Sequence, residues 1–138
     1  MTNTQKGQLG QTNVKQKLRA AGFNVRQMDY NCHYDLLVNG LRVEVKRATP
    51  NRAYRWFINI HRHGKLTEEG TDIYIFCLDG IPGNAKMPIY LVYRSPLETY
   101  SMSYSFSSLL RRDHPAIDNW DLMRGKEKRG STAAEEAV

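Results

Sequence analysis

The sequence predicts an α/β (α+β) domain in which flanking helices cover a central mixed β-sheet. A helical pattern near the start of the chain is followed by six segments of strand character. Two of these segments are joined by Asn39-Gly40, a strongly favoured two-residue hairpin turn. The run DIYIFCL, residues 72–78, is almost continuously apolar, which is typical of a central strand buried on both faces. A chain of 138 residues is long enough for one such domain.

The first expected element is a helix over residues 5–21. Its apolar residues recur at helical spacing and mark a buried stripe, which comprises Val14, Leu18 and Ala21. Gly22 follows directly and is the residue type that commonly ends a helix. Gln11 lies at the edge of the stripe, so its side chain is expected to point toward the sheet.

The segment 34–47 predicts an antiparallel hairpin, because Val- and Leu-rich runs flank Asn39-Gly40. Counting outward from the turn pairs Asp35 with Glu44 and places Lys46 on the same face of the strands. The opposite face is apolar and comprises Tyr34, Leu36, Val38, Leu41, Val43 and Val45. The hairpin therefore presents one face to a core and gathers charged groups on the other.

Two carboxylates directly opposite each other have Cβ atoms about 4.5 to 5.5 Å apart and repel. A divalent cation would relieve this repulsion. Mg²⁺, with Mn²⁺ as the alternative, takes one or two carboxylates and completes its coordination with water and phosphate. With the Lys46 ammonium nearby, Asp35 and Glu44 form the arrangement that metal-assisted phosphodiester hydrolysis requires. The alternative interpretation is a surface hairpin with solvated charges and a Glu-Lys ion pair.

Asp35, an eight-residue gap, and then Glu44-Val45-Lys46 resemble the core motif of the PD-(D/E)XK nucleases. This restriction-endonuclease-like superfamily includes archaeal Holliday junction resolvases. The resemblance implies a restriction-endonuclease-like fold. It also implies that Asp35 and Glu44 hold the metal together with the carbonyl of Val45. Lys46 would then orient the attacking water or stabilise the pentavalent phosphorus.

The chain departs from that family pattern at two positions. A glutamate from the first helix often joins the metal site, in a pattern like G-x-x-x-E, whereas here Gly7 is followed at that spacing by Gln11. Gln11 is therefore expected as a secondary ligand or positioning group. Tyr34 stands where the family has proline. The resemblance further implies DNA as the substrate and, as in small members of the family, a homodimer.

The net charge of +6 is unevenly distributed along the chain. Residues 1–65 contain twelve Lys and Arg against three acids, whereas residues 66–138 contain eight against eleven. This asymmetry favours a polyanionic partner, with DNA as the first candidate, although a basic half that is simply solvated remains the alternative. The expected DNA contacts are Arg47, Arg52, Arg55, Arg62 and Lys65.

The remaining segments are assigned more coarsely. Further strands are expected at 23–28, 56–60, 72–78 and 89–93. Residues 97–105 are expected to form a loop that packs on the sheet or meets a second subunit, and residues 107–119 a helix interrupted by Pro115. Trp120 and Leu122 are expected to dock on the core. The predicted domain covers residues 1–123, and residues 124–138 have the composition of a disordered tail.

The composition limits the function classes. No apolar run approaches the roughly 20 residues of a membrane span and the first residues lack a signal-peptide core, so a cytoplasmic location is expected. Cys32 and Cys77 are widely spaced and are expected to be reduced thiols, with Cys77 buried. The leading hypothesis is a Mg²⁺-dependent DNA endonuclease, with structure-selective cleavage left open. The alternatives are a non-catalytic nucleic-acid-binding module on the same scaffold and a protein whose basic face meets an acidic partner protein.

Overall fold

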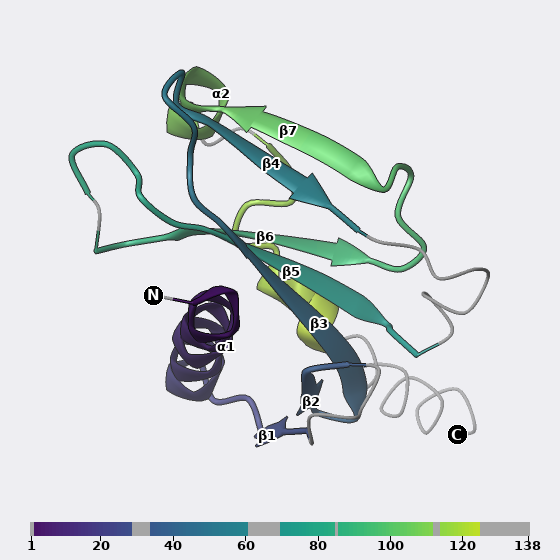
Figure 1. Ribbon diagram of the computed structural model, residues 1–138. Helices are drawn as coiled ribbons and strands as arrows, with labels where there is room; N and C mark the ends of the chain where they lie inside the picture. Colours follow the sequence, from purple (N-terminus) through teal and green to yellow (C-terminus); the bar gives the residue numbers. More distant parts are fainter. Residues whose placement is uncertain (1, 29–33, 61–69, 85, 112–113, 125–138) are drawn as a thin grey trace.

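The computed structural model describes residues 2–28, 34–60, 70–84, 86–111 and 114–124 (Figure 1). Its elements in chain order are α1 (Asn3–Ala20), β1 (Val25–Gln27), β2 (Leu36–Val38), β3 (Leu41–Ala48), β4 (Arg55–Asn59), β5 (Ile73–Leu78), β6 (Ile89–Arg94), β7 (Ser101–Ser105), α2 (Phe106–Leu110) and a 3-10 helix, η2 (Trp120–Arg124). The main sheet has five strands in the order β1-β2-β3-β5-β6. Strands β3 and β5 are parallel and the other neighbours are antiparallel, which confirms the predicted mixed sheet.

The sheet separates two hydrophobic cores. Helix α1 and η2 cover one face, and the two-stranded ribbon of β4 and β7 covers the other (Figure 1). All six residues of β5 are buried because the strand is covered on both faces, as the sequence predicted. Cys77 of β5 is fully buried, and burial raises the pKa of its thiol to about 12. This thiol is therefore protonated and unreactive at neutral pH.

Helix α1 begins and ends at recognisable caps. The Thr2 hydroxyl accepts the Gln5 backbone N–H, and the Gln5 side chain accepts the Thr2 N–H, a reciprocal arrangement that satisfies two N-terminal donors. Gly22 adopts a φ of +90° after the last turn, as expected. The prediction that Ala21 is buried is wrong, because the helix ends at Ala20 and Ala21 turns outward as the cap. None of the described helices is both long and apolar enough to span a membrane.

The hairpin forms in the predicted register. Asn39 and Gly40 take φ values of 49° and 82°, and Leu36 lies opposite Val43. Strand β2 is only three residues long, whereas β3 continues to Ala48. Within the described residues, β2 pairs only with residues 41–43 of β3. Residues 44–48 of β3 extend beyond β2.

The C-terminal part differs from the prediction. Residues 101–105, expected in a loop, form β7, and β7 pairs with β4 in a separate ribbon outside the main sheet. The helix expected over 107–119 is the single short turn of α2, and Pro115 lies beyond it in irregular chain. Trp120 and Leu122 pack against the core, as predicted.

Arg124, the first residue of the predicted tail, is part of the described structure. Arg124 belongs to η2, and its guanidinium carbon lies 5.4 Å from the centre of the Phe23 ring, a cation–π distance. Phe23 itself is buried in the core between α1 and the sheet. Arg124 is thus held by the domain, and residues 125–138 lie outside the described part of the chain.

Candidate functional site

A hollow of about 430 Å³ lies beside the second part of β3, where that strand has run past β2. Helix α1 supplies one wall, the residue before β2 supplies another, and β3 supplies the floor. The lining residues are Lys6, Gly7, Gln11, Asp35, Glu44, Val45, Lys46 and Arg47. The hollow therefore brings together all five residues that the sequence predicted for metal binding and catalysis.

Hydrogen bonds from its backbone N–H and to its carboxylate hold Asp35 in the hollow. Its backbone N–H donates to the Val43 carbonyl at 2.9 Å, and its Oδ2 accepts the Val45 N–H at 2.7 Å. Its Oδ1 accepts a hydrogen bond from Nε2 of Gln11 at 3.1 Å. The carboxylate thus satisfies a β3 backbone donor that β2 does not reach, which holds it in the same hollow as Glu44.

Glu44 forms an ion pair with Lys46, with 3.3 Å between Oε1 and Nζ. Burial raises the pKa of Glu44; Lys46 works against this rise and the neighbouring Asp35 charge adds to it. Burial also raises the pKa of Asp35, partly offset by the Val45 N–H and by Lys46. The two acids therefore repel each other across one hollow, as the register predicted.

The donor set of the hollow fits a hard divalent cation. The two carboxylates and the Val45 carbonyl would offer oxygen ligands to such an ion, which would also stabilise the carboxylates whose pKa values burial raises. No group of three or more His, Cys, Asp or Glu residues could hold a metal in the described part of the chain. Two carboxylates suffice for Mg²⁺ when water and substrate phosphate complete the coordination.

Gln11 presents its amide N–H, and not its oxygen, to the acid pair. Its Oε1 accepts a hydrogen bond from Nε2 of Gln27 at 2.9 Å, and the same Gln27 group donates to the Asp35 backbone carbonyl at 3.1 Å. In this arrangement Gln11 positions Asp35. The sequence analysis missed Gln27, because its link to the site arises from the pairing of β1 with β2, which no local pattern encodes.

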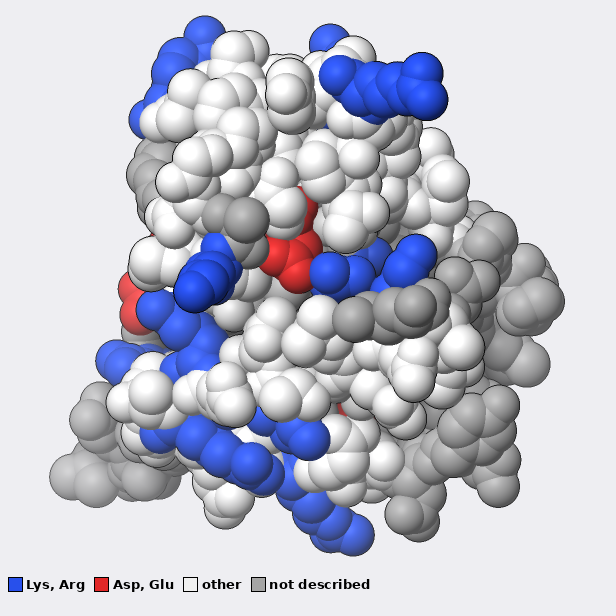
Figure 2. Space-filling view, turned by 60° about the vertical axis from the view of Figure 1, so that its left-hand side comes forward, with Lys and Arg blue, Asp and Glu red and all other residues white. Residues whose placement is uncertain are grey.

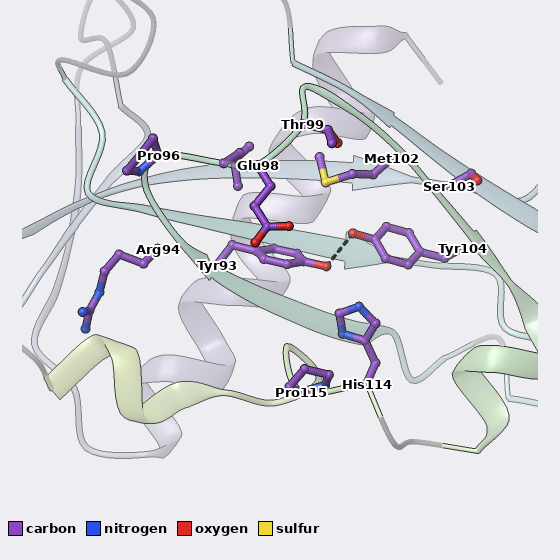
Figure 3. Close-up of a pocket in the computed structure, with 11 residues that line it drawn as sticks. Tyr93, Arg94, Pro96, Glu98, Thr99, Met102, Ser103, Tyr104, His114 and Pro115 are labelled. Atoms are coloured by element: carbon purple, nitrogen blue, oxygen red, sulfur yellow. Dashed lines mark hydrogen bonds between the residues drawn. The ribbon is translucent and has the colours of Figure 1, made fainter.

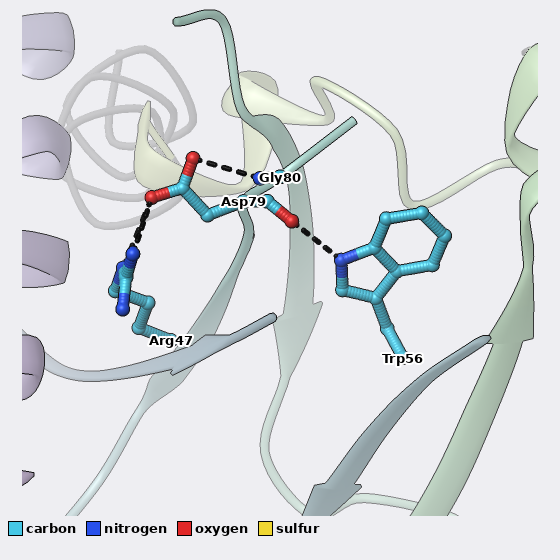
Figure 4. Close-up of polar contacts among 4 residues, drawn as sticks. All are labelled: Arg47, Trp56, Asp79 and Gly80. Atoms are coloured by element: carbon cyan, nitrogen blue, oxygen red, sulfur yellow. Dashed lines mark hydrogen bonds and ion pairs between the residues drawn. The ribbon is translucent and has the colours of Figure 1, made fainter. Parts of the chain in front are cut away.

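Arg47 lines the hollow, but its guanidinium is engaged by Asp79, with Nη2 to Oδ2 at 2.7 Å (Figure 4). The two side chains are only 12% and 13% exposed. The Asp79 carboxylate also accepts the Gly80 N–H, and its backbone carbonyl accepts Nε1 of Trp56 at 2.7 Å. Arg47 thus fastens β3 to the end of β5, and its predicted contact with DNA stays a prediction.

Of the other predicted DNA contacts, the structure describes Arg52 and Arg55, and neither lines the hollow. Arg52 and Arg55 are exposed in the connection after β3 and at the start of β4. Arg62 and Lys65 lie outside the described residues. On the face drawn in Figure 2, Lys and Arg side chains flank a small recessed patch of Asp and Glu on two sides. A basic surface beside a buried acidic patch is the charge pattern expected where a polyanion approaches a cation site.

The described elements define a structural class, a small α+β domain built on a mixed five-stranded sheet. Among solved structures, the chain is similar to a bacterial homing endonuclease, I-Ssp6803I, with a TM-score of 0.72 over 94% of this chain and 97% of that chain. The sequence identity is 13%, so the likeness establishes the shared fold alone. No family model matches the chain. No curated protein matches it either.

Proposed function

We propose that this protein is a divalent-metal-dependent endonuclease that hydrolyses phosphodiester bonds in DNA. The observation that carries the proposal is the partly buried pair of Asp35 and Glu44, both with raised pKa values, beside Lys46 in one hollow. The nuclease fold and the basic first half of the chain support it. A cation at this position would serve chemistry on a phosphate, and it would also stabilise the two partly buried carboxylates.

Asp35, Glu44 and the carbonyl of Val45 would hold the metal, Mg²⁺ or Mn²⁺. Such an ion polarises a phosphate oxygen and lowers the pKa of water. Side chains and backbone groups of the chain orient the metal ligands. Gln11 and the Val45 N–H keep the Asp35 carboxylate in place, so the ligand geometry exists before the substrate arrives.

Lys46 acts on the phosphate. In the metal-free protein its ammonium pairs with Glu44. When Glu44 is engaged by a cation, the ammonium can turn toward the scissile group, since both side chains project from the same face of β3. It then stabilises the negative charge that develops on the phosphate oxygens, or holds the attacking water.

The active species in this proposal is a homodimer, because cleaving both strands of a duplex or branched substrate requires two sites. Each chain supplies one acid pair, and therefore one proposed site. Light scattering with and without DNA measures the stoichiometry. A protein that cuts both strands while it stays monomeric contradicts this part of the proposal.

The decisive experiment is a cleavage panel of duplex, flap, junction and single-stranded DNA with Mg²⁺, Mn²⁺ or EDTA. Wild type should cut at least one substrate with metal and none with EDTA. Lys46→Ala and Asp35→Ala should remove the activity while circular dichroism shows an intact fold. Lys17→Ala, an exposed lysine at the far end of α1, is the matched control and should cut normally. Full activity of either site variant would refute the proposal.

A second candidate function is a non-catalytic DNA-binding module, and the observation that favours it is Gln11. The Gln11 side-chain N–H donates to Oδ1 of Asp35. A glutamate at this position would instead add a negatively charged metal ligand. This candidate predicts salt-sensitive binding without metal and no cleavage across the panel. Gln11→Glu separates the two functions: if the missing acid keeps the site inactive, the variant gains metal-dependent cleavage that the wild type lacks.

A further inference from the structure

The β4–β7 ribbon turns a polar and aromatic face outward. Along β4, buried Trp56 and Ile58 alternate with exposed residues, and the register sets these exposed residues opposite serines of β7. We call this surface the ribbon face. It comprises Arg55, Phe57, Asn59, Ser101 and Ser103. In Figure 1 the ribbon forms the outer layer, on the side of the sheet opposite α1.

Phe57 lies at the centre of the ribbon face and is 53% exposed, although the ribbon already has a well-filled inner side. An exposed phenylalanine between an arginine and an asparagine costs solvation and contributes nothing to the core. None of the five residues is acidic. Among the described residues, Arg55 takes part in no ion pair. The face thus has an uncommitted positive charge and an exposed apolar ring, features of a contact surface for a polyanion.

The chemistry of the ribbon face suits base edges. A guanidinium matches O6 and N7 of guanine, a carboxamide matches N6 and N7 of adenine, and an apolar ring contacts the thymine methyl. Ser101 donates to Oδ1 of Asn59 at 2.9 Å, which fixes the orientation of the carboxamide. A side chain held in this way loses less conformational entropy on binding.

The shape of the ribbon also suits duplex DNA. The major groove, about 12 Å wide, admits a two-stranded β-ribbon. The connection from β3, which carries Glu44 and Lys46, to β4 is only residues 49–54. Asn51 fixes this connection, because its Oδ1 accepts the N–H groups of Ala53 and Arg55. The site strand and the ribbon are therefore joined by a short, hydrogen-bonded turn.

We propose that the ribbon face enters the major groove of duplex DNA and reads base edges, with Arg55, Phe57 and Asn59 as specificity-determining residues. This inference rests on the proposed function, because it assigns that nuclease a preferred duplex sequence. Arg55 is then more than a phosphate contact. Its exchange for lysine keeps the charge but removes the paired N–H donors that guanine requires.

The test is selection of bound sites from a randomised duplex pool at fixed salt, with Lys46→Ala as the parent so that cleavage does not interfere. The parent should enrich a defined sequence. Arg55→Lys should lose discrimination at one base pair by about 5- to 150-fold while total affinity changes little, and Asn59→Ser should lose it at another. Arg94→Lys is the matched control, an exposed arginine at the end of β6, and should select the parental sequence.

Two results would overturn the inference: a parent that enriches no sequence, or ribbon variants that enrich the parental one. Because the altered side chains are exposed, circular dichroism should show an unchanged fold.

Failure of the proposed nuclease function can be distinguished from failure of this inference. If no substrate in the panel is cut but selection behaves as expected, the ribbon face stands without the nuclease. If the wild type cuts all duplexes equally well, the nuclease stands without the ribbon face.

Discussion

Two hollows of the domain differ in size and in chemistry. The larger one, about 630 Å³, lies between β6 and β7 and is lined mainly by tyrosine, methionine, proline and histidine side chains (Figure 3). The Tyr93 and Tyr104 hydroxyls bond each other at 2.7 Å, and Nδ1 of His114 accepts the Ala116 N–H. The smaller hollow holds Asp35 and Glu44, both with raised pKa values, and the Lys46 ammonium that pairs with Glu44.

This comparison shows that volume is a poor guide to function here. In the aromatic hollow the buried polar groups satisfy one another. In the acidic hollow the charges are not balanced in this way, because burial and the Asp35 charge raise the pKa of Glu44 and the ion pair with Lys46 offsets this rise only in part. Ionisable groups with shifted pKa values and incomplete charge compensation in the free protein are typical of binding sites. We therefore propose the acidic hollow as the functional site, although it is the smaller of the two.

The largest expected effect comes from exchanging one glutamate in each hollow. Glu44→Gln should reduce metal-dependent DNA cleavage by about 100-fold or more, because a charged ligand for the cation is lost. Glu98→Gln removes the same charge from the rim of the aromatic hollow and should leave cleavage unchanged. Rates on the best substrate of the panel measure both. Equal losses in the two variants would remove the distinction between the hollows.

The next effect separates two arginines of β3. Arg47→Ala leaves the Asp79 carboxylate unpaired in a buried position and should lower the free energy of unfolding by about 3 kcal/mol. Arg42, whose side chain is 40% exposed, pairs with Asp72, and Arg42→Ala should cost about 1 kcal/mol at most. Urea denaturation at pH 7 measures both. A small cost for Arg47→Ala would show that its side chain is free for DNA after all.

A smaller effect concerns two glycines of α1. A Cβ on Gly10 would lie 2.8 Å from Cβ of Arg47, so Gly10→Ala should destabilise the protein by about 1 to 2 kcal/mol despite its better helix propensity. A Cβ on Gly7 meets nothing within 4 Å, and Gly7→Ala should stabilise by about 0.5 to 1 kcal/mol. Thermal and urea unfolding check the signs. Equal effects at both positions would contradict the close approach of α1 to β3.

The smallest effect is on the pH dependence of stability. Raised pKa values of Asp35 and Glu44 mean that the folded protein holds these protons more tightly than the unfolded chain does. Their contribution to stability is full below about pH 4 and is lost as the pH rises through their folded pKa values. Asp35→Asn/Glu44→Gln should flatten that decline in metal-free protein. Tyr93→Phe should not, because burial raises the pKa of Tyr93 above its usual alkaline value.

Much of the site could be predicted from the sequence because its key feature is local. Asn39-Gly40 sets the register of one hairpin, and that register places Asp35 near Glu44. Features that depend on distant pairing could not be predicted. The segment SMSYS has little strand character of its own and becomes β7 because β4 offers it a partner. The capture of Arg47 by Asp79 likewise follows from the parallel pairing of β3 with β5, which only the fold reveals.

The central claim is that the acid pair holds a divalent cation, and calorimetric titration with Mn²⁺ tests it most directly. Wild-type protein should bind one ion per chain at neutral pH, more weakly as the pH falls and the carboxylates take up protons. Asp35→Asn/Glu44→Gln should abolish this binding. Mn²⁺ binding of equal strength in the double variant, or none in the wild type even with DNA present, would contradict the account.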